Sequence, residues 1–419
     1  MQLGEIGNPD AILHGKPLDG VRILAAEQMQ SLPFATQLLA RLGADVVKVE
    51  HPVHGESGRG STPAMADPEG RNVGATFLRN NFNKRSLGLN LRSDDGRDLF
   101  LRLVPRFDVV ADNFKAGTMA KFGLGYDDIA AAHPGAVVIS ISGFGNTGES
   151  PYRDWPAYNS IVEAMSGIYD YMRPADGPPR VNPMGAVADI TAGLFAAIGI
   201  LSALRHREAT GLGQYIDLAM FDTTVALADL VVNFESLGIP RNPVPAPFVI
   251  TPVRCSDGYV VLQFVREHQF ERLADLVGCP EWKDDPRFAE RTGWGLHLAD
   301  VILPAIEAWA DGRSRVEVAN ALATENLVAG PSYTPGEVVT DPHLEARNMV
   351  VAMPRTDGVE PPVLVPGNPL KMSRVAEGPE TRVPWVGEHT AELLEVELDL
   401  DPDELARLRA DGVITDCPH

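Results

Sequence analysis

One aspartate carries the strongest chemical signal in this sequence, because it stands where a helix of small residues is predicted to begin. Asp189 opens the segment DITAGLFAAIGILSALRHR (residues 189–207), whose glycines and alanines let a second helix or a ligand approach closely. In a structural interpretation, Asp189 is an N-cap that accepts hydrogen bonds from unpaired backbone N–H groups. In a functional interpretation, the helix dipole holds the carboxylate anionic, so that it acts as a nucleophile at neutral pH. Local sequence alone favours the cap and leaves both interpretations open.

A glycine-rich loop at residues 143–148 (GFGNTG) imitates the fingerprint of a dinucleotide-binding fold. The next residues, 149–156, contain two prolines and no helical periodicity, so no helix N-terminus is available to hold a pyrophosphate. The pattern therefore indicates a plain glycine-rich loop near a ligand, and not a nicotinamide cofactor. The ten histidines form no HExxH-like pair, and we expect no metal site.

The composition is that of an ordered globular protein, with 44% hydrophobic and 22% charged residues among 419. Acidic residues outnumber basic ones 57 to 36, and the net charge of −21 disfavours nucleic-acid and anionic membrane partners. The three cysteines have no metal-ligand spacing, which suits a reduced cytoplasm. Residues 1–20 lack a signal-peptide core, and nowhere do 18 uncharged apolar residues run together. We therefore expect a soluble cytoplasmic protein.

Short apolar runs alternate with helical patterns along the first half of the chain. Strands are expected at residues 21–26, 45–49, 107–111, 136–141 and 215–220. Helices are expected from Pro33 to Gly43, over 96–104 and over 189–207. Strand, helix and strand within thirty residues indicate a βαβ unit. The predicted fold class is therefore α/β, with a parallel sheet covered by helices on both faces.

The sequence predicts a large N-terminal domain over 1–225 and a smaller domain over 248–329. Four prolines within eight residues mark a linker over 226–247. A loop-rich second linker over 330–369 leads to a C-terminal segment, 370–419, with helical patterns near 388–395 and 402–410.

Several short motifs occur in one order along nearly the whole chain. They are LDGV (18–21), LGADVVKVE (42–50), NKRS (83–86), DNF (112–114), SGFG (142–145), GAVADITAG (185–193), GQ with ID (213–217), DPRF (285–288), GEHT (387–390) and GVI (412–414). Each motif alone is weak, but their order and spacing together are specific. The chain resembles the family III CoA-transferases, a group that includes formyl-CoA transferase, carnitine CoA-transferase and the related 2-methylacyl-CoA racemases.

The resemblance implies an enzyme that moves CoA between carboxylic acids through an anhydride and a thioester on a nucleophilic aspartate, here Asp189. It implies that Gln30 lies beside the thioester and that Tyr158 lies near the nucleophile in the substrate pocket. The CoA-binding positions that it implies are His51, Asn83, Lys84, Asn113 and Lys121. A CoA thioester is then a substrate, and neither a metal nor a tightly bound cofactor is expected.

The sequence departs from formyl-CoA transferase at three places. His51 replaces an arginine at the adenine contact, and Pro156 replaces an active-site lysine. The proline-rich residues 242–248 stand where that relative has a mobile run of glycines. A formyl-CoA or oxalate specificity is therefore not expected.

Two alternatives to transfer are compatible with the resemblance: a 2-methylacyl-CoA racemase and a CoA-ester binding protein without turnover. Racemases supply a His-Asp pair just before a Ser-Gly, whereas this chain has Tyr158 and Asn159 ahead of Ser166. Tyrosine is a poor base near neutral pH and asparagine does not titrate, so transfer is favoured. An intact Asp189 argues against binding alone. The resemblance further implies a Rossmann-like large domain built from both chain ends, an inserted smaller α+β domain, and an interlocked homodimer.

Overall fold

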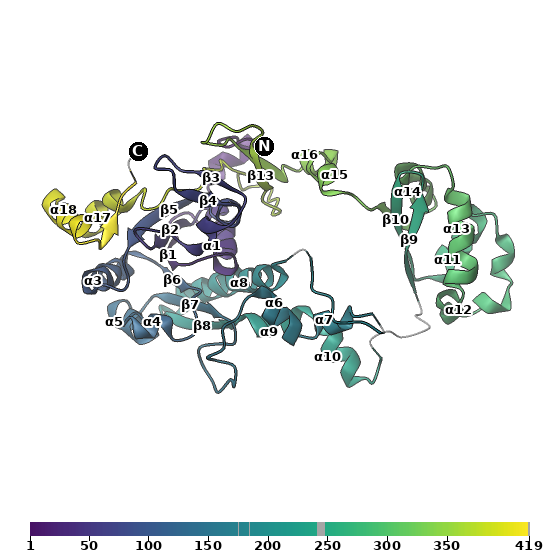
Figure 1. The fold of residues 1–419 in the computed structure, drawn as a ribbon, viewed down its shortest axis with the longest axis horizontal. Helices are drawn as coiled ribbons and strands as arrows, with labels where there is room; N and C mark the ends of the chain where they lie inside the picture. The colour runs from purple at the N-terminus through teal and green to yellow at the C-terminus, as the bar shows by residue number, and fades with distance from the viewer. Residues whose placement is uncertain (175, 184, 241–247, 418–419) are drawn as a thin grey trace. The chain divides into compact units, whose positions relative to one another are not determined.

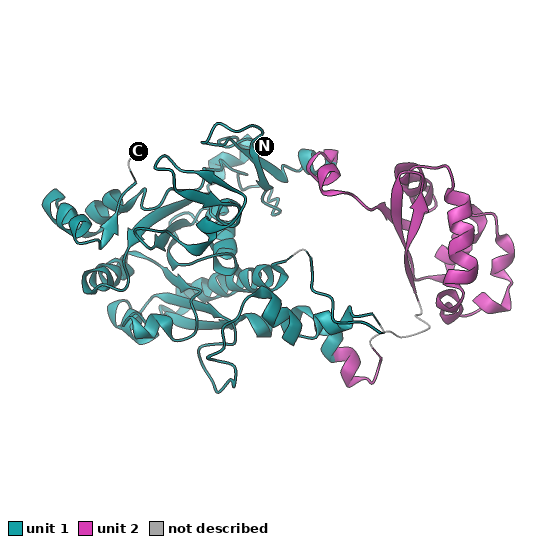
Figure 2. Cartoon of the chain, viewed as in Figure 1, with its two compact units in different colours: residues 1–232, 343–419 teal, residues 233–342 magenta. Residues whose placement is uncertain are grey.

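The computed structural model describes residues 1–174, 176–183, 185–240 and 248–417. The chain divides into two compact units (Figure 2): the first comprises residues 1–232 and 343–419, and the second comprises residues 233–342. Of the predicted linker 226–247, residues 241–247 lie outside the described residues. The stretch 330–369 contains short regular elements: helices α15 (Pro335–Val339) and α16 (Pro342–Ala346) and the antiparallel strands β12 (Val350–Met353) and β13 (Val363–Pro366).

A seven-stranded sheet forms the centre of the first unit (Figure 1). In sheet order its strands are β14 (Ile414–Thr415), β5 (Lys84–Leu89), β2 (Asp45–Glu50), β1 (Arg22–Ala26), β6 (Val109–Asp112), β7 (Val137–Ser142) and β8 (Gln214–Ala219). Every neighbouring pair is parallel except β14 with β5. The predicted α/β class with a parallel sheet is confirmed. Because β2 and β6 lie on opposite sides of β1, the strand order reverses between β1 and β6, where open α/β sheets bind ligands.

Helices cover both faces of this sheet. The helices on one face are α1 (Ser31–Arg41), α6 (Asn159–Met165), α8 (Val187–Thr210) and α9 (Met220–Leu227). Those on the other face are α3 (Asp94–Leu103), α4 (Thr118–Lys121), α5 (Tyr126–Ala132), α17 (Thr390–Leu398) and α18 (Pro402–Ala410). Alternate residues of β1 supply the two cores: Ile23 packs toward α1 and Leu24 toward α3, and both are fully buried.

Helix α8 is the longest in the first unit and packs directly against α1. A Cβ on Gly193 would lie 2.6 Å from the Ser31 carbonyl oxygen, so only glycine permits this approach. By length and composition α8 is apolar enough to cross a membrane, but half of its apolar window is buried inside the protein. Its packing on α1, β7 and β8 accounts for the buried half of that apolar surface, and the other half is exposed in this chain.

The second unit has its own core around an antiparallel sheet of β9 (Val249–Cys255), β10 (Gly258–Phe264) and β11 (Val328–Pro331). Its longer helices are α11 (Glu267–Leu276), α12 (Arg291–Leu296), α13 (Leu303–Ala310) and α14 (Arg315–Thr324). Phe264, Phe270 and Trp294 pack ring against ring in this core. The other strands and α-helices of the described residues are β3 (Ala64–Ala66), β4 (Asn72–Gly74), α2 (Ala75–Leu78), α7 (Ile168–Tyr171) and α10 (Asp229–Ser236).

Candidate active site

Two adjoining cavities lie at the carboxyl ends of the parallel strands of the first unit. One, of about 390 Å³, is lined by Asp189 and is called the Asp189 cavity. The other, of about 330 Å³, is lined by His51 and is called the His51 cavity. Gln28 and Phe114 line both cavities. Because Gln28 follows β1 and Phe114 follows β6, the shared wall stands at the point where the strand order reverses.

The loop from β1 to α1 is fixed from both sides. The Asn113 side chain accepts a hydrogen bond from the Gln28 backbone N–H at 2.8 Å and donates one to the Gln28 carbonyl at 2.8 Å. The Glu56 carboxylate accepts from the Met29 N–H at 2.8 Å. Met29 has a φ of 59°, a strained value for a residue with a side chain. These contacts hold the loop in the conformation that presents Gln30 to the Asp189 cavity.

Asp189 is the third residue of α8, so the N-cap interpretation is wrong. The N-cap position belongs to Ala186, whose φ is 61° and whose side chain makes no capping bond. Burial, joined by the negative charge of Glu163 and opposed by Arg79, raises the pKa of Asp189 from 3.8 to about 6. Burial and Glu163 therefore outweigh the stabilisation of the anion by the helix end, but a pKa of about 6 still leaves most of Asp189 anionic at neutral pH.

Gln30 lines the same cavity and is only 6% exposed. Its Oε1 accepts a hydrogen bond from Arg79 Nη2 at 2.6 Å. Because arginine can only donate, this bond fixes the amide orientation and leaves the donor Nε2 for the cavity. Gln30 is thus oriented as a hydrogen-bond donor in the wall of the cavity that Asp189 also lines.

Tyr158 also lines the Asp189 cavity, together with two cationic side chains that sequence reasoning did not find, Lys115 and Arg153. Tyr158 is 74% exposed, which rules out a buried core role for it within this chain. The structure therefore brings together Asp189, Gln30, Asn113 and Tyr158 from four separate segments.

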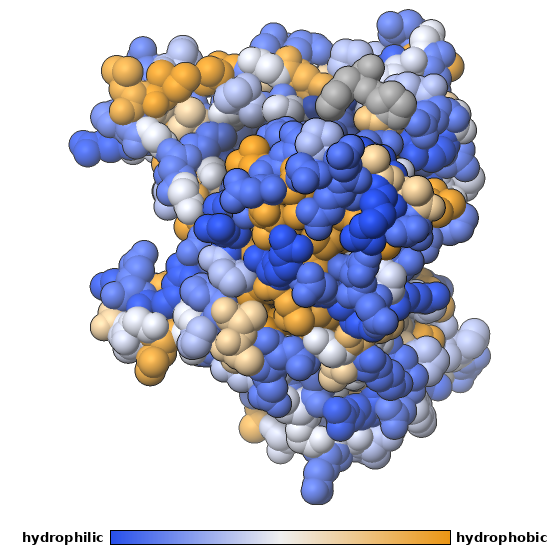
Figure 3. Space-filling view, turned by 90° about the vertical axis from the view of Figure 1, so that its left-hand side faces the viewer, coloured by the Kyte–Doolittle hydropathy of each residue, from blue (hydrophilic) through white to orange (hydrophobic). Residues whose placement is uncertain are grey.

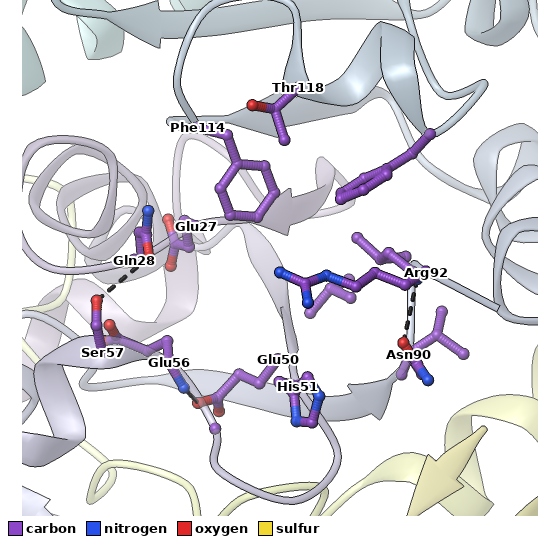
Figure 4. Close-up of a pocket in the computed structure, with 15 residues that line it drawn as sticks. Glu27, Gln28, Glu50, His51, Glu56, Ser57, Asn90, Arg92, Phe114 and Thr118 are labelled. Carbon is purple, nitrogen blue, oxygen red and sulfur yellow. Dashed lines mark hydrogen bonds between the residues drawn. The ribbon is translucent and has the colours of Figure 1, made fainter. Parts of the chain in front are cut away.

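The His51 cavity combines aromatic and cationic groups at the ends of β2 and β5 (Figure 4). His51 stacks on His54 with ring centroids 5.3 Å apart, and burial, with help from His54 and Arg92, lowers the pKa of His51. Arg92 extends across the cavity toward its centre, below Phe114. A neutral imidazole and a guanidinium suit an aromatic base and a phosphate respectively.

A buried ionic network lies beneath the His51 cavity, and it contains Lys84. The Lys84 ammonium donates to Glu27 at 2.7 Å and is fully buried, and burial lowers its pKa to about 8. Lys48 lies 3.5 Å from the same carboxylate, and Arg59 binds Glu50 with two hydrogen bonds. Lys84 therefore neutralises a carboxylate of the cavity wall instead of reaching the cavity, contrary to the expectation that it contacts CoA.

Two further predicted CoA contacts lie away from both cavities. The Asn83 side chain donates to Glu380 at 2.9 Å and accepts from the Thr381 N–H, on a separate hollow at the start of β5. Lys121 is exposed at the end of α4, and Thr118 of that helix, not Lys121, lines the His51 cavity. Within the described residues, neither side chain completes a binding site.

The glycine-rich loop after β7 is held by Asp217, which accepts from the N–H groups of Asn146 and Thr147. No helix follows it until α6, as predicted, so it has no dinucleotide-binding geometry. Its first residue, Gly143, lines the Asp189 cavity. Across the described residues, no group of three His, Cys, Asp or Glu side chains is placed to hold a metal ion.

The sequence matches CoA-transferase family III over residues 18–390. The chain belongs to this family. It is 35% identical over 391 residues to the succinyl-CoA:mesaconate CoA-transferase of Haloarcula hispanica, covering 90% of this chain and 96% of the relative. It is 33% identical over 392 residues to the succinate–glutarate CoA-transferase of Agrobacterium fabrum, covering 90% and 95%. A solved CaiB/BaiF family protein from Brucella suis superimposes with a TM-score of 0.78 at 33% identity, over 91% of this chain and 100% of that one.

This family III CoA-transferase therefore acts on CoA thioesters and carboxylic acids, in keeping with its relatives. Sequence reasoning missed Arg79, Arg92 and Glu163, which contribute charge to the two cavities or to Asp189. Arg92 had a readable signal, because it follows the apolar run of β5 by three residues. Arg79 and Glu163 had no such sequence signal, because each acts on Asp189 across a contact between segments that are distant in the sequence.

The face in Figure 3 is mostly hydrophilic, with hydrophobic residues showing between hydrophilic ones near its centre.

Proposed function

We propose that this chain transfers CoA from an acyl-CoA to a carboxylic acid through covalent intermediates on Asp189. The observation that carries the proposal is the placement of Asp189 and the Gln30 amide donor in one cavity that adjoins the His51 cavity. The His51 cavity suits the nucleotide end of CoA, and the Asp189 cavity suits the thioester.

The reaction begins when an Asp189 oxygen attacks the thioester carbonyl, which breaks the C–S bond and gives a mixed anhydride and a CoA thiolate. The thiolate attacks the Asp189 carbonyl, forms an aspartyl-CoA thioester and releases the donor carboxylate. The acceptor carboxylate then attacks this thioester, which gives a second anhydride and the thiolate again. Attack of the thiolate on the acceptor carbonyl forms the new acyl-CoA and restores Asp189.

Each attack places negative charge on a carbonyl oxygen. We assign the Gln30 amide N–H as the hydrogen-bond donor that stabilises this oxyanion. The bond from Arg79 orients the amide before substrate binds, so little reorganisation is needed in the transition state. The exchange of one thioester for another conserves energy, and the proposed steps use only this chain's carboxylate and the CoA thiol.

We infer that the acceptor is a short dicarboxylic acid. The relatives' names give mesaconate and glutarate beside succinyl-CoA or succinate. The Asp189 cavity of this chain has Lys115 and Arg153 in its wall, and either cation suits a carboxylate that does not react. A panel of mono- and dicarboxylic acceptors tests this class directly.

Racemisation is not supported by Tyr158 and Asn159, which stand where the racemases have their His-Asp pair. Asn159 donates to Glu163 at 2.8 Å and accepts from the Asp189 N–H at 3.1 Å, so both its amide nitrogen and its amide oxygen already have partners in the protein. Tyr158 is exposed and lies in the cavity wall without a neighbouring carboxylate partner among the described contacts. Neither residue is equipped to exchange a proton with an α-carbon.

We also propose a homodimer. One face of α8 exposes four apolar side chains, Leu194, Phe195, Ile198 and Leu201, with Ile198 59% exposed. A continuous apolar stripe of this kind on a helix surface favours burial against a partner, and the resemblance implies a second copy of the chain.

Asp189→Asn tests the proposed function. Loss of a covalent nucleophile is expected to lower transfer by several orders of magnitude, whereas loss of a structural carboxylate leaves the rate nearly unchanged. Wild-type enzyme incubated with acyl-CoA and then hydroxylamine should lose activity, with a hydroxamate on the peptide that contains Asp189. Asp127→Asn, an exposed first-turn aspartate of α5, is the matched control and should keep full activity. Near-normal transfer by Asp189→Asn, or modification of another carboxylate, would refute the assignment.

A further inference from the structure

A second carboxylate, Glu163 on α6, lies buried behind Asp189. It is 1% exposed. Its Oε2 accepts from the Tyr169 hydroxyl at 2.7 Å, and its Oε1 accepts from Asn159 Nδ2 at 2.8 Å and from the Ala188 N–H at 3.2 Å. All three partners donate, which suits an ionised carboxylate.

Within the described residues, no lysine, arginine or histidine forms an ion pair with Glu163. An unpaired buried charge is costly, and a neutral side chain of similar shape would usually be more stable in the same place. A buried Glu163 carboxylate without an ion-pair partner therefore indicates a role other than packing.

The hydrogen bonds of Glu163 lead directly to the nucleophile. Ala188 precedes Asp189 in the chain, and Asn159 joins the Glu163 carboxylate to the Asp189 N–H. Glu163 thus holds the first turn of α8 at two successive N–H groups, one directly and one through the Asn159 amide. The same proximity makes Glu163 the charged neighbour that disfavours the anion of Asp189.

We propose that Glu163 is a positioning residue that fixes the Asp189 backbone and whose charge favours the uncharged, acylated state of Asp189 over its free carboxylate. The inference rests on the proposed function. In the first half of that reaction Asp189 passes from an anion to a neutral anhydride and then to a neutral thioester, and in the second half it returns through an anhydride to the anion. A like charge nearby raises the free energy of the anion and not of the ester, so it moves the covalent equilibrium toward the intermediates.

The other charged or titratable groups that face Asp189 act differently. Arg79, from the end of α2, opposes Glu163. Lys115, Arg153 and Tyr158 line the cavity on the substrate side. Glu163 is thus the negatively charged group that acts on Asp189 from the protein interior.

Glu163→Gln separates the charge from the hydrogen bonds. The Gln oxygen can accept from Asn159 and Ala188, and the Tyr169 hydroxyl can rotate to accept from the Gln amide. The packing and the three contacts of this side chain are kept, the direction of the bond to Tyr169 is reversed, and the negative charge is removed. Tyr169→Phe is the complementary control, because it removes one hydrogen bond to Glu163 and keeps the charge.

Two measurements test the inference on full-length enzyme. The first is the pH profile of kcat/KM for acyl-CoA, whose acid limb should move to lower pH by about one unit in Glu163→Gln. The second is mass spectrometry of the aspartyl-CoA thioester at a fixed ratio of acyl-CoA to free acid, where the trapped fraction relative to free enzyme should fall about tenfold. Tyr169→Phe should not lower the acid limb.

The outcomes distinguish this inference from the proposed function. If wild-type enzyme forms no thioester on Asp189, the proposed function itself fails. If wild type forms it and Glu163→Gln leaves both the acid limb and the trapped fraction unchanged, the charge role of Glu163 is wrong. If Glu163→Gln does not fold, Tyr169→Phe decides: an acid limb that moves down although the charge remains would overturn the inference.

Discussion

Asp189→Asn should make the protein more stable at neutral pH while it abolishes transfer. A carboxylate whose pKa in the folded state is about 6, above its ordinary 3.8, destabilises the folded state once it ionises. The sign follows from proton binding: between pH 4 and 6 the folded state keeps a proton that the unfolded state has lost, so stability falls as the pH rises. Above pH 6 the full cost is present, and below pH 4 it vanishes.

The rise in pKa from 3.8 to about 6 corresponds to an upper bound of about 3 kcal/mol. Because Asp189 is only partly buried and solvent screens part of the effect, we expect about 1–2 kcal/mol in practice. Thermal unfolding should therefore give a Tm for Asp189→Asn about 2–4 °C above wild type at pH 8. The difference should shrink toward zero at pH 4.

Asp127→Asn, made at an exposed first-turn aspartate, should show no such pH-dependent gain. A Tm for Asp189→Asn that is lower than wild type at pH 8, or a gain that is equal at pH 4 and pH 8, would refute the electrostatic reasoning.

Three further outcomes are expected. Gln30→Ala should lower kcat by about 10²–10³-fold with little change in KM, because it removes one oxyanion donor, and steady-state kinetics measure this; a change confined to KM would contradict it. A 2-methylacyl-CoA incubated with enzyme in deuterated water should gain no label above background, since Tyr158 and Asn159 are no acid–base pair, and rapid incorporation would favour a racemase. Sedimentation at nanomolar concentration should show a dimer, and a monomer would count against the interlocked assembly.

The sheet could be predicted from the sequence because each strand is a short apolar run with a helix pattern beside it. The strands predicted at residues 45–49 and 136–141 appear as β2 and β7 within a residue or two. The strand at residues 249–255 was not predicted. It alternates buried and exposed residues and contains Pro252, which disguises it as part of the preceding proline-rich stretch.

The site was harder to predict, because its chemistry depends on contacts between distant segments. The start of α8 could be placed near Asp189, but not its N-cap, since Ala186 adopts a left-handed conformation that sequence does not favour. Lys84 was expected to contact CoA because the NKRS segment resembles the family's CoA-binding segment. In the structure β5 lies beside β2, and β2 lies beside β1, so the Lys84 side chain is buried and reaches Glu27, which directly follows β1. No periodicity reveals such a pairing.

The opposed charges around Asp189 make sense if this residue must be both ionised and reactive. A carboxylate with the ordinary pKa is fully anionic but weakly basic, and basicity favours attack on a thioester. Burial and Glu163 raise its pKa, and Arg79 limits the rise. At a pKa of about 6, about nine-tenths of Asp189 is still anionic at pH 7. Removing Arg79 would raise the pKa further and lower the anionic fraction at pH 7, and removing Glu163 would lower the pKa and weaken the basicity, although burial would still raise it. The two opposed charges therefore suit the proposed role of Asp189 as a nucleophile at neutral pH.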